Sequence, residues 1–268
     1  MLNNIKNITL FDLKNNKKLI FGWAVSIFGI MFLYMILFPS VQDMAQIKMQ
    51  AMPEELMRFM GMSDFSDMSN FVSYFAMIYN IILIAISIFA VTFAANLVLK
   101  EEKSKTIEFL YSLQVSKIEI YLSKFFVAYI AALFVICSAV VATLICGFIN
   151  GGETFVFLDV VSIVKLSSIT PLIYLSIGSM LAGISGKISG ATVGSMIVIL
   201  SYVLGFLSTM VSESLSWLEY LSPFQVFSPT LALESGIDGL INMCLYCAVM
   251  FAFVAIGGAL YNKRDFKI

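Results

Sequence analysis

Long apolar stretches alternate with short polar gaps along the chain. A helix of about 20 apolar residues crosses the roughly 30 Å hydrocarbon core of a bilayer. The stretches long enough to do so cover residues 19–38, 71–99, 125–149, 166–186, 188–211 and 240–261. The pattern therefore predicts an all-α membrane protein, in which residues 1–268 form a single transmembrane domain with six transmembrane helices.

Positive charge is largely confined to every second gap. All of the 16 Lys and Arg residues except Lys48, Arg58 and Lys165 lie in the first segment, in gap 100–124, at Lys187 or in the C-terminal tail. Cytoplasmic loops of membrane proteins carry the excess of Lys and Arg. We therefore expect both termini to lie in the cytoplasm.

The segment before the first apolar stretch, residues 2–17, has the pattern of a short amphipathic helix. The residues that can share one face are Leu2, Ile5, Ile8, Thr9 and Leu13, with Lys residues at its edge. Such an interfacial helix would lie on the inner leaflet before turning into the first span. The alternative is a polar tail. The apolar stretch that follows is too long for the h-region of a signal peptide.

The gap 39–70 is rich in methionine. Its Met residues are Met44, Met49, Met52, Met57, Met60, Met62 and Met68. One interpretation is a thioether site for copper(I). The other is a pair of amphipathic helices on the outer membrane surface, the second starting at Pro53. We favour the helices, because the gap contains no Cys or His. In the gap 212–239 aromatic residues predict a segment that dips into the outer leaflet.

The composition supports a membrane protein and excludes most enzyme chemistry. The chain is 60% hydrophobic and 12% charged, whereas a soluble domain is about 25% charged. It has no His, which removes the commonest general base and metal ligand, and its four Cys lie inside apolar stretches. We therefore predict no catalytic, cofactor or metal site in this chain. Nucleic acid is not an expected partner, because no basic cluster contains interleaved aromatic residues.

The energy for any transport must come from outside the predicted spans. Four of them, 125–149, 166–186, 188–211 and 240–261, contain no Asp, Glu, Lys or Arg. Ion-coupled transporters usually place such groups at membrane depth, because these groups bind the driving ion. The absence argues against proton coupling, and less strongly against sodium coupling.

Small residues recur every four positions around the turn between the fourth and fifth spans. They are Gly178, Ala182, Gly186, Gly190 and Gly194. This spacing lets helix backbones approach closely in lipid. We expect these glycines to serve helix packing.

The gap 100–124 predicts a short amphipathic helix, a break near residue 113 and a new helix from Lys117 that runs into the third span. Ser116 and Glu119 have the spacing of a capping box. Val115 and Ile120 flank the box as a hydrophobic staple. A short helix between two spans offers a surface to a cytoplasmic partner.

This gap resembles the loop between the second and third spans of ABC-2 type ABC-transporter permeases. That loop follows approximately the pattern E-x-x-x-G-T-x-E-x-L-L-x-x-P-V-S-R, with a Lys further on. The matching or nearly matching residues are Glu101, Thr106, Glu108, Leu110, Val115, Ser116, Lys117 and Lys124. Lys105, Tyr111 and Gln114 depart from the pattern, where Gly, Leu and Pro are usual. The segment 220–224 before the last span, Tyr-Leu-Ser-Pro-Phe, also resembles the family.

The resemblance implies that the loop helix is a coupling helix, which docks on a separate cytoplasmic ATP-binding subunit. The coupling residues would be Thr106, Glu108, Leu110, Val115, Ser116 and Lys117. ATP and magnesium would bind that partner, since this chain has no phosphate loop. A second permease subunit, identical or related, would complete the transporter in the bacterial cell membrane.

The spans are compatible with more than one class of cargo. Nearly uncharged, Phe-rich spans suit an amphipathic or hydrophobic cargo such as a membrane-active peptide, an antibiotic or a lipid. One alternative is an ABC-type efflux permease for sodium or another small cargo. Another is a membrane scaffold or sensor that transports nothing.

Overall fold

The computed structural model describes residues 2–48, 69–103, 115–184, 190–210, 217, 219–233 and 236–264. Over these residues the secondary structure is entirely helical. The long elements are α1 (Leu2–Ile36), α4 (Phe71–Val98), α7 (Lys117–Asn150), α8 (Phe157–Ser167) followed by α9 (Ile169–Ile184), α10 (Gly190–Met210) and α12 (Gly236–Lys263). With α8 and α9 taken as one span, these give six candidate membrane spans, as the sequence predicted.

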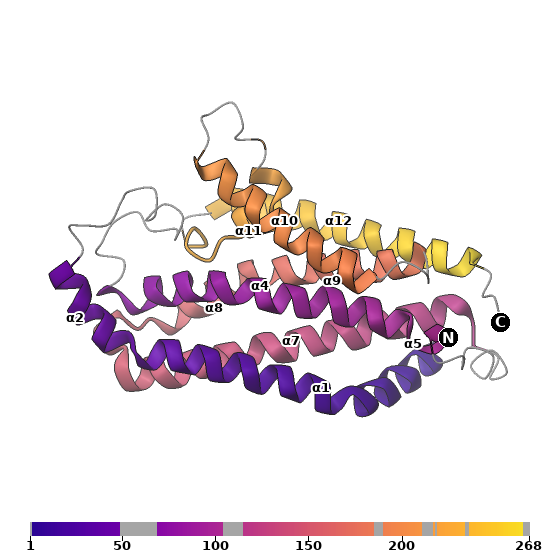
Figure 1. The fold of residues 1–268 in the computed structure, drawn as a ribbon, viewed down its shortest axis with the longest axis horizontal. Helices are drawn as coiled ribbons and strands as arrows, with labels where there is room; N and C mark the ends of the chain where they lie inside the picture. The colour runs from indigo at the N-terminus through magenta and orange to yellow at the C-terminus, as the bar shows by residue number, and fades with distance from the viewer. Residues whose placement is uncertain are drawn as a thin grey trace.

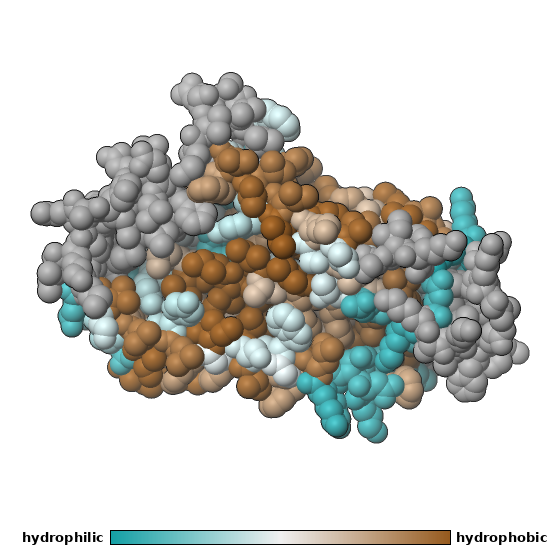
Figure 2. All heavy atoms as spheres, in the orientation of Figure 1, coloured by the Kyte–Doolittle hydropathy of each residue, from teal (hydrophilic) through white to brown (hydrophobic). Residues whose placement is uncertain are grey.

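The spans lie side by side in one elongated bundle, with α4 along its centre (Figure 1). The most extensive packing joins α1 to α7, α4 to α9 and α9 to α12. The core is apolar and aromatic; Phe75, Leu83 and Ile86 of α4 are fully buried. By contrast, α12 buries little of its surface and exposes Leu245, Phe251 and Ile256. Figure 2 shows hydrophobic residues across the middle of one face, as expected for a surface that faces lipid.

The two ends of the bundle are formed by different elements. The start of α1, the short helix α5 (Lys100–Lys103), the start of α7 and the end of α12 all lie at one end (Figure 1). The helix α2 (Phe38–Lys48) and the 3-10 helix η3 (Gly152–Thr154) lie at the opposite end. The short helix α11 (Pro223–Val226) packs near α10 and α9. The basic segments therefore gather at one end, which is the arrangement that the charge pattern requires.

The N-terminal segment is helical, as expected, but it is continuous with the first span. α1 runs from Leu2 to Ile36 without a break, and Figure 1 shows it bending along its length. Part of the face assigned to the inner leaflet packs on protein instead, since Thr9 is buried and its hydroxyl donates to the Ser123 carbonyl at 3.5 Å. Leu10 and Phe11 of this segment are exposed.

The fourth span begins earlier than predicted. The helix α8 occupies most of the expected outer gap 150–165, and a turn at Ser168 separates it from α9. Val160 and Ile163 of α8 are fully buried. The two charges of α8 lie at its ends, Asp159 in the first turn and Lys165 in the last, where each is favourable to the helix dipole.

In the gap 39–70, α2 supplies one of the two expected helices. Residues 49–68, which include Pro53 and most of the methionines, lie outside the described residues. The second helix therefore stays a prediction, and the copper(I) alternative is not tested.

Candidate functional site

The segment predicted to couple to a partner lies between α5 and α7. Thr106, Glu108 and Leu110 lie outside the described residues, whereas Val115, Ser116 and Lys117 form the entry to α7. The structure therefore fixes both edges of this segment, although it does not describe residues 104–114.

The capping box at the start of α7 is confirmed. The Ser116 hydroxyl accepts a hydrogen bond from the Glu119 backbone N–H at 3.3 Å, and a Glu119 carboxylate oxygen accepts one from the Ser116 N–H at 2.9 Å. Two backbone donors that the helix itself leaves without partners are satisfied in this way. Ile120 is fully buried and Val115 half-buried. The box sets the residue at which α7 begins, and thus where the preceding loop must end.

A buried ionic cluster, formed by Asp12, Glu101 and Lys124, lies about two helical turns further along α7 than this cap. Lys124 Nζ is 2.6 Å from Asp12 Oδ2 and also contacts Glu101 Oε1. The side chains of Lys124, Asp12 and Glu101 are 1%, 2% and 12% exposed. Burying charges is costly unless they are paired. Here one ammonium group lies between two carboxylates, so α1, α5 and α7 are joined at a single point.

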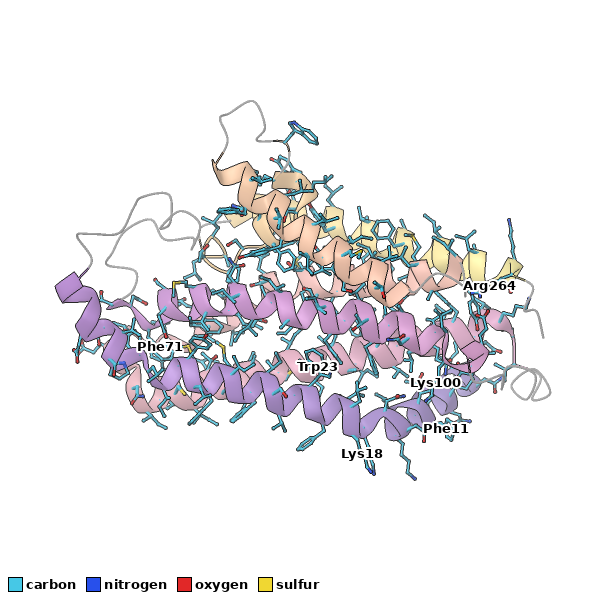
Figure 3. All side chains as sticks on the ribbon, viewed as in Figure 1. Phe11, Lys18, Trp23, Phe71, Lys100 and Arg264 are labelled. Carbon is cyan, nitrogen blue, oxygen red and sulfur yellow. The ribbon has the colours of Figure 1, made fainter. Side chains whose placement is uncertain are left out.

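A second connection, the terminal ion pair, joins Glu102 of α5 to Arg264 after α12. The Arg264 guanidinium nitrogen Nη2 donates to both Glu102 oxygens, at 2.5 and 2.6 Å. Its Nη1 donates to the Ala182 carbonyl at 3.2 Å, and Lys117 Nζ donates to the Arg264 carbonyl at 2.6 Å. The pair therefore also reaches α9 and the first residue of α7. Figure 3 shows Arg264 and Lys100 at the same end of the bundle.

Together the two sets of contacts bracket residues 104–114. Glu101 and Glu102 lie directly before this segment, and Lys117 and Lys124 follow it. These contacts link the residues on both sides of the segment to α1, α7, α9 and α12. Among the described residues of this arrangement, no nucleophile is paired with a base. Among the residues that the structure describes, no three His, Cys, Asp or Glu residues gather to hold a metal ion.

Comparison with known families supplies the identity that this geometry alone does not. Residues 11–261 match the family described as "Multidrug efflux system permease Rv1217c, C-terminal domain". The chain belongs to this family of efflux permeases. A search of curated proteins finds no match. Family and fold together describe a multi-pass membrane efflux permease.

The glycines predicted to pack helices in this permease lie mostly against α4. A methyl group on Gly178 would overlap the backbone of Val91, and one on Gly194 would overlap the Val91 side chain. At Gly190 it would lie 3.3 Å from the Ala95 Cβ. Gly186 lies outside the described residues. Gly178, Gly190 and Gly194 therefore pack closely against α4 within the chain.

Sequence reasoning missed three members of the charged contacts: Asp12, Glu102 and Arg264. Glu101 and Lys124 were noted only as matches to a family pattern. One local signal was available for Asp12, which is the only acid in an N-terminal segment otherwise rich in Lys. Its partner Lys124 lies 112 residues away, and nothing local in the sequence indicates that pairing.

Proposed function

We propose that this efflux permease is the membrane subunit of an ABC-2 type exporter. ATP and magnesium bind a separate cytoplasmic subunit, and this chain carries no catalytic residues of its own. A second permease subunit completes the transport path. The assembly sits in the bacterial plasma membrane and moves an amphipathic or hydrophobic cargo out of the cell.

The observation that carries this proposal is the position of the charged contacts around residues 104–114. The segment resembles the coupling helix of the ABC-2 family, and the buried ionic cluster and the terminal ion pair lie at its two edges. A loop with no mechanical role does not require buried charges at its base, because burial without a function adds a desolvation cost. If an ATP-binding partner moves this segment, the contacts would pass the movement to α1, α7, α9 and α12.

The proposal of an external energy source rests on the scarcity of charged residues in the membrane spans. In the described parts of α9, α10 and the apolar stretch of α12 there is no acidic or basic side chain. The fourth span carries Asp159 and Lys165, both in its first part, α8. The charged residues of α7 cluster at its start. A driving ion would therefore find few of the groups that usually bind it at membrane depth.

The test is whether an ATPase binds this chain and drives efflux through residues 104–114. The tagged permease is purified from native membranes in mild detergent, and the proteins that accompany it are identified. A stoichiometric ATP-binding subunit is expected, together with a second six-span chain or a second copy of this one. Leu110→Asp is expected to reduce recovery of the ATPase.

The variant Glu108→Arg tests whether ATP hydrolysis can be uncoupled from transport while the ATPase still binds. In inside-out vesicles this variant is expected to insert normally but to lose ATP-driven uptake of a fluorescent amphipathic dye, while hydrolysis continues. Glu153→Arg is the matched control, because Glu153 is an exposed acid of η3 at the opposite end of the bundle. Normal transport by Glu108→Arg would refute the coupling assignment. Purification without any ATPase would favour a scaffold or sensor, and flux that persists without ATP would favour ion coupling.

A further inference from the structure

An apolar groove of about 270 Å³ lies between α1 and α7 near the charged end of the bundle. The α1 residues that line it have the spacing of one helical face. The lining consists of Leu13, Lys17, Ile20 and Phe21 from α1, and of Ile130, Ala131 and Phe134 from α7. Phe21, Ile130 and Phe134 are exposed, so the groove opens on the apolar surface that faces lipid.

The groove exists because a small residue lies where α1 and α7 pack in parallel. Three hydrogen bonds, each between residues 114 apart in the chain, set the register of the two helices. They join Thr9 to Ser123, Phe32 to Cys146 and Ile36 to Asn150. In this register Lys17 lies level with Ala131, which is 1% exposed. The short Ala131 side chain therefore forms the floor and leaves the space beside Lys17 unfilled.

Lys17 lies at the depth of the lipid headgroups. At 1.5 Å per residue, α1 is about 28 Å long between Lys17 and Ile36, close to the roughly 30 Å thickness of the hydrocarbon core. Lys17 therefore lies at one boundary of the core, and Phe21 and Phe134 lie about one helical turn deeper. A lipid at this place has its phosphate beside Lys17 and its chain inside the groove.

The charge around the groove is positive. Lys17 belongs to a basic patch of three exposed lysines on α1, with Lys14 and Lys18. Figure 3 shows Lys18 pointing away from the bundle. In the part of the chain that the structure describes, Lys17 makes no ion pair, and the groove lining contains no acid. Asp12, the acid of this segment, is bound to Lys124 instead.

We infer that this groove binds an anionic phospholipid of the leaflet at the charged end. The phosphate contacts Lys17, and one acyl chain lies between Phe21 and Phe134. A zwitterionic lipid binds more weakly, because its positive group meets the basic patch. The volume is below the usual range for small-molecule pockets, about 300–1,000 Å³, so the groove takes one chain and not a helix of a protein partner.

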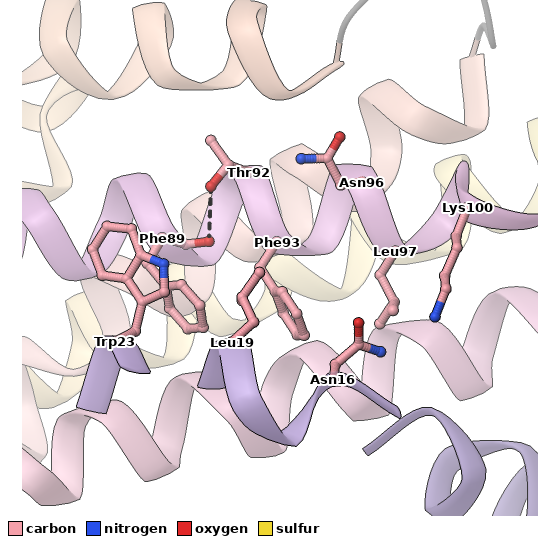
Figure 4. Close-up of a pocket in the computed structure, with 9 residues that line it drawn as sticks. All are labelled: Asn16, Leu19, Trp23, Phe89, Thr92, Phe93, Asn96, Leu97 and Lys100. Atoms are coloured by element: carbon pink, nitrogen blue, oxygen red, sulfur yellow. Dashed lines mark hydrogen bonds between the residues drawn. The ribbon is translucent and has the colours of Figure 1, made fainter. Parts of the chain in front are cut away.

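The opposite side of α1 supplies an internal control for an assay. Trp23 lies in a separate cavity of about 240 Å³ between α1 and α4, with its ring centroid 5.2 Å from that of Phe89 (Figure 4). The other tryptophan of the chain is Trp217. Trp217→Phe alone therefore leaves an indole outside the groove, which is the control reporter. Phe21→Trp combined with Trp23→Phe and Trp217→Phe gives the groove reporter, because Phe21 is 62% exposed and has room for a larger ring.

The probes are phosphatidylglycerol and phosphatidylcholine with the same chains, one of which carries bromine atoms that quench indole fluorescence on contact. Each is added to the purified permease in mild detergent. Phosphatidylglycerol is expected to quench the groove reporter saturably, and at a lower mole fraction than phosphatidylcholine. The control reporter should show no such preference.

Substitutions of lysine then test the headgroup contact. In the groove reporter, Lys17→Gln should raise the half-quenching mole fraction of phosphatidylglycerol about fivefold, the contribution of one Lys near an anionic lipid surface. Lys17→Arg should bind as the parent does, which shows that the loss reflects charge. Lys263→Gln is the matched control, since Lys263 is an exposed residue in the last turn of α12 at the same end of the bundle.

Four results would overturn the inference. The first is equal quenching of the groove reporter by the two lipids. The second is equal weakening by Lys17→Gln and Lys263→Gln. The third is the same preference for phosphatidylglycerol in the control reporter, which would mean that anionic lipid gathers around α1 without a site. The fourth is displacement of the lipid by soluble glycerol phosphate, which would indicate a site for the phosphate group alone.

Two further measurements keep the test decisive. Quenching by a brominated maltoside detergent should be the same in all variants of a reporter, which checks that each is folded. If Phe21→Trp does not fold, Phe134→Trp in the same background places the indole on the facing wall of the groove. The assay needs no ATPase, so its outcome is independent of the proposed transport cycle.

Discussion

The charged end of the bundle and its middle are held together by different kinds of contact. At the charged end, Lys124 lies between two carboxylates, and Asp12 lies near two ammonium groups. In the middle, Gly178 brings α9 directly against the backbone of Val91 on α4, with no side chain between the two helices. The first kind of contact can be rearranged by small movements of side chains. The second can change only if whole helices separate.

This difference indicates which helices of the bundle can shift relative to one another and which stay together. The ionic cluster has more charged groups than one pair needs, so it can exchange partners as α1, α5 and α7 shift. The contact of α4 with α9 depends on dispersion forces and close fit, which are the main attractions between helices in lipid. We therefore expect α4 and α9 to move as one body while the charged end adjusts.

Lys124→Met should have the largest effect, because it leaves Asp12 and Glu101 as buried carboxylates without their shared partner. Breaking a buried ion pair in this way costs about 3–5 kcal/mol. The free energy of unfolding can be compared by titrating the detergent-solubilised permease with SDS. The matched control, Lys18→Met, removes an exposed Lys of α1 and should change stability by no more than about 0.5 kcal/mol.

A triple variant sharpens this prediction. Lys124→Met combined with Asp12→Leu and Glu101→Gln removes the stranded charges and should recover much of the stability, since apolar replacements of buried ion pairs are often tolerated. If the single variant is as stable as the parent, the cluster is not buried as described. If the triple variant is stable but inactive in efflux, the charges serve coupling instead of folding.

The sequence predicted the fold well wherever the signal was local and long. Each span is a run of apolar residues, and the cap at Ser116 depends on a pair three residues apart, so both were visible. The helix α8 was not predicted, because most of it falls in the gap between the third and fourth apolar stretches. Hydropathy reports the average of a segment, whereas burial of Val160 and Ile163 depends on which face meets α4 and α7.

The charged contacts and the glycine packing were predicted only in part, because they also depend on which helices meet in the fold. The row of glycines indicated close packing but not the partner, since Val91 lies about 90 residues before Gly178 in the chain. The pairs Asp12–Lys124 and Glu102–Arg264 likewise join segments 112 and 162 residues apart. Contacts of this kind follow from the tertiary arrangement. A single sequence contains no period or spacing that indicates them.

Gly178→Ala tests the middle of the bundle and should have the second largest effect. The added methyl group overlaps the Val91 carbonyl, which is backbone and cannot rotate away. Overpacking of this kind costs about 1–3 kcal/mol. The matched control is Gly22→Ala on α1, where no atom lies within 4 Å of the added carbon. That variant should keep or slightly raise stability in the same SDS titration. Equal stability of the two variants would show that α4 and α9 can separate easily, which would contradict their movement as one body.

Ser116→Ala should have the smallest effect, because it removes one local cap and leaves the ionic cluster intact. Loss of an N-cap side chain costs about 1 kcal/mol. Ser116→Asp should restore most of this, since Asp caps as well as Ser. The control is Ser26→Ala, whose hydroxyl only donates to the Gly22 carbonyl within α1. If Ser116→Ala were instead as damaging as Lys124→Met, the start of α7 would depend on its cap more than on its buried charges. The contrast between the charged end and the close-packed middle would then need a different cause.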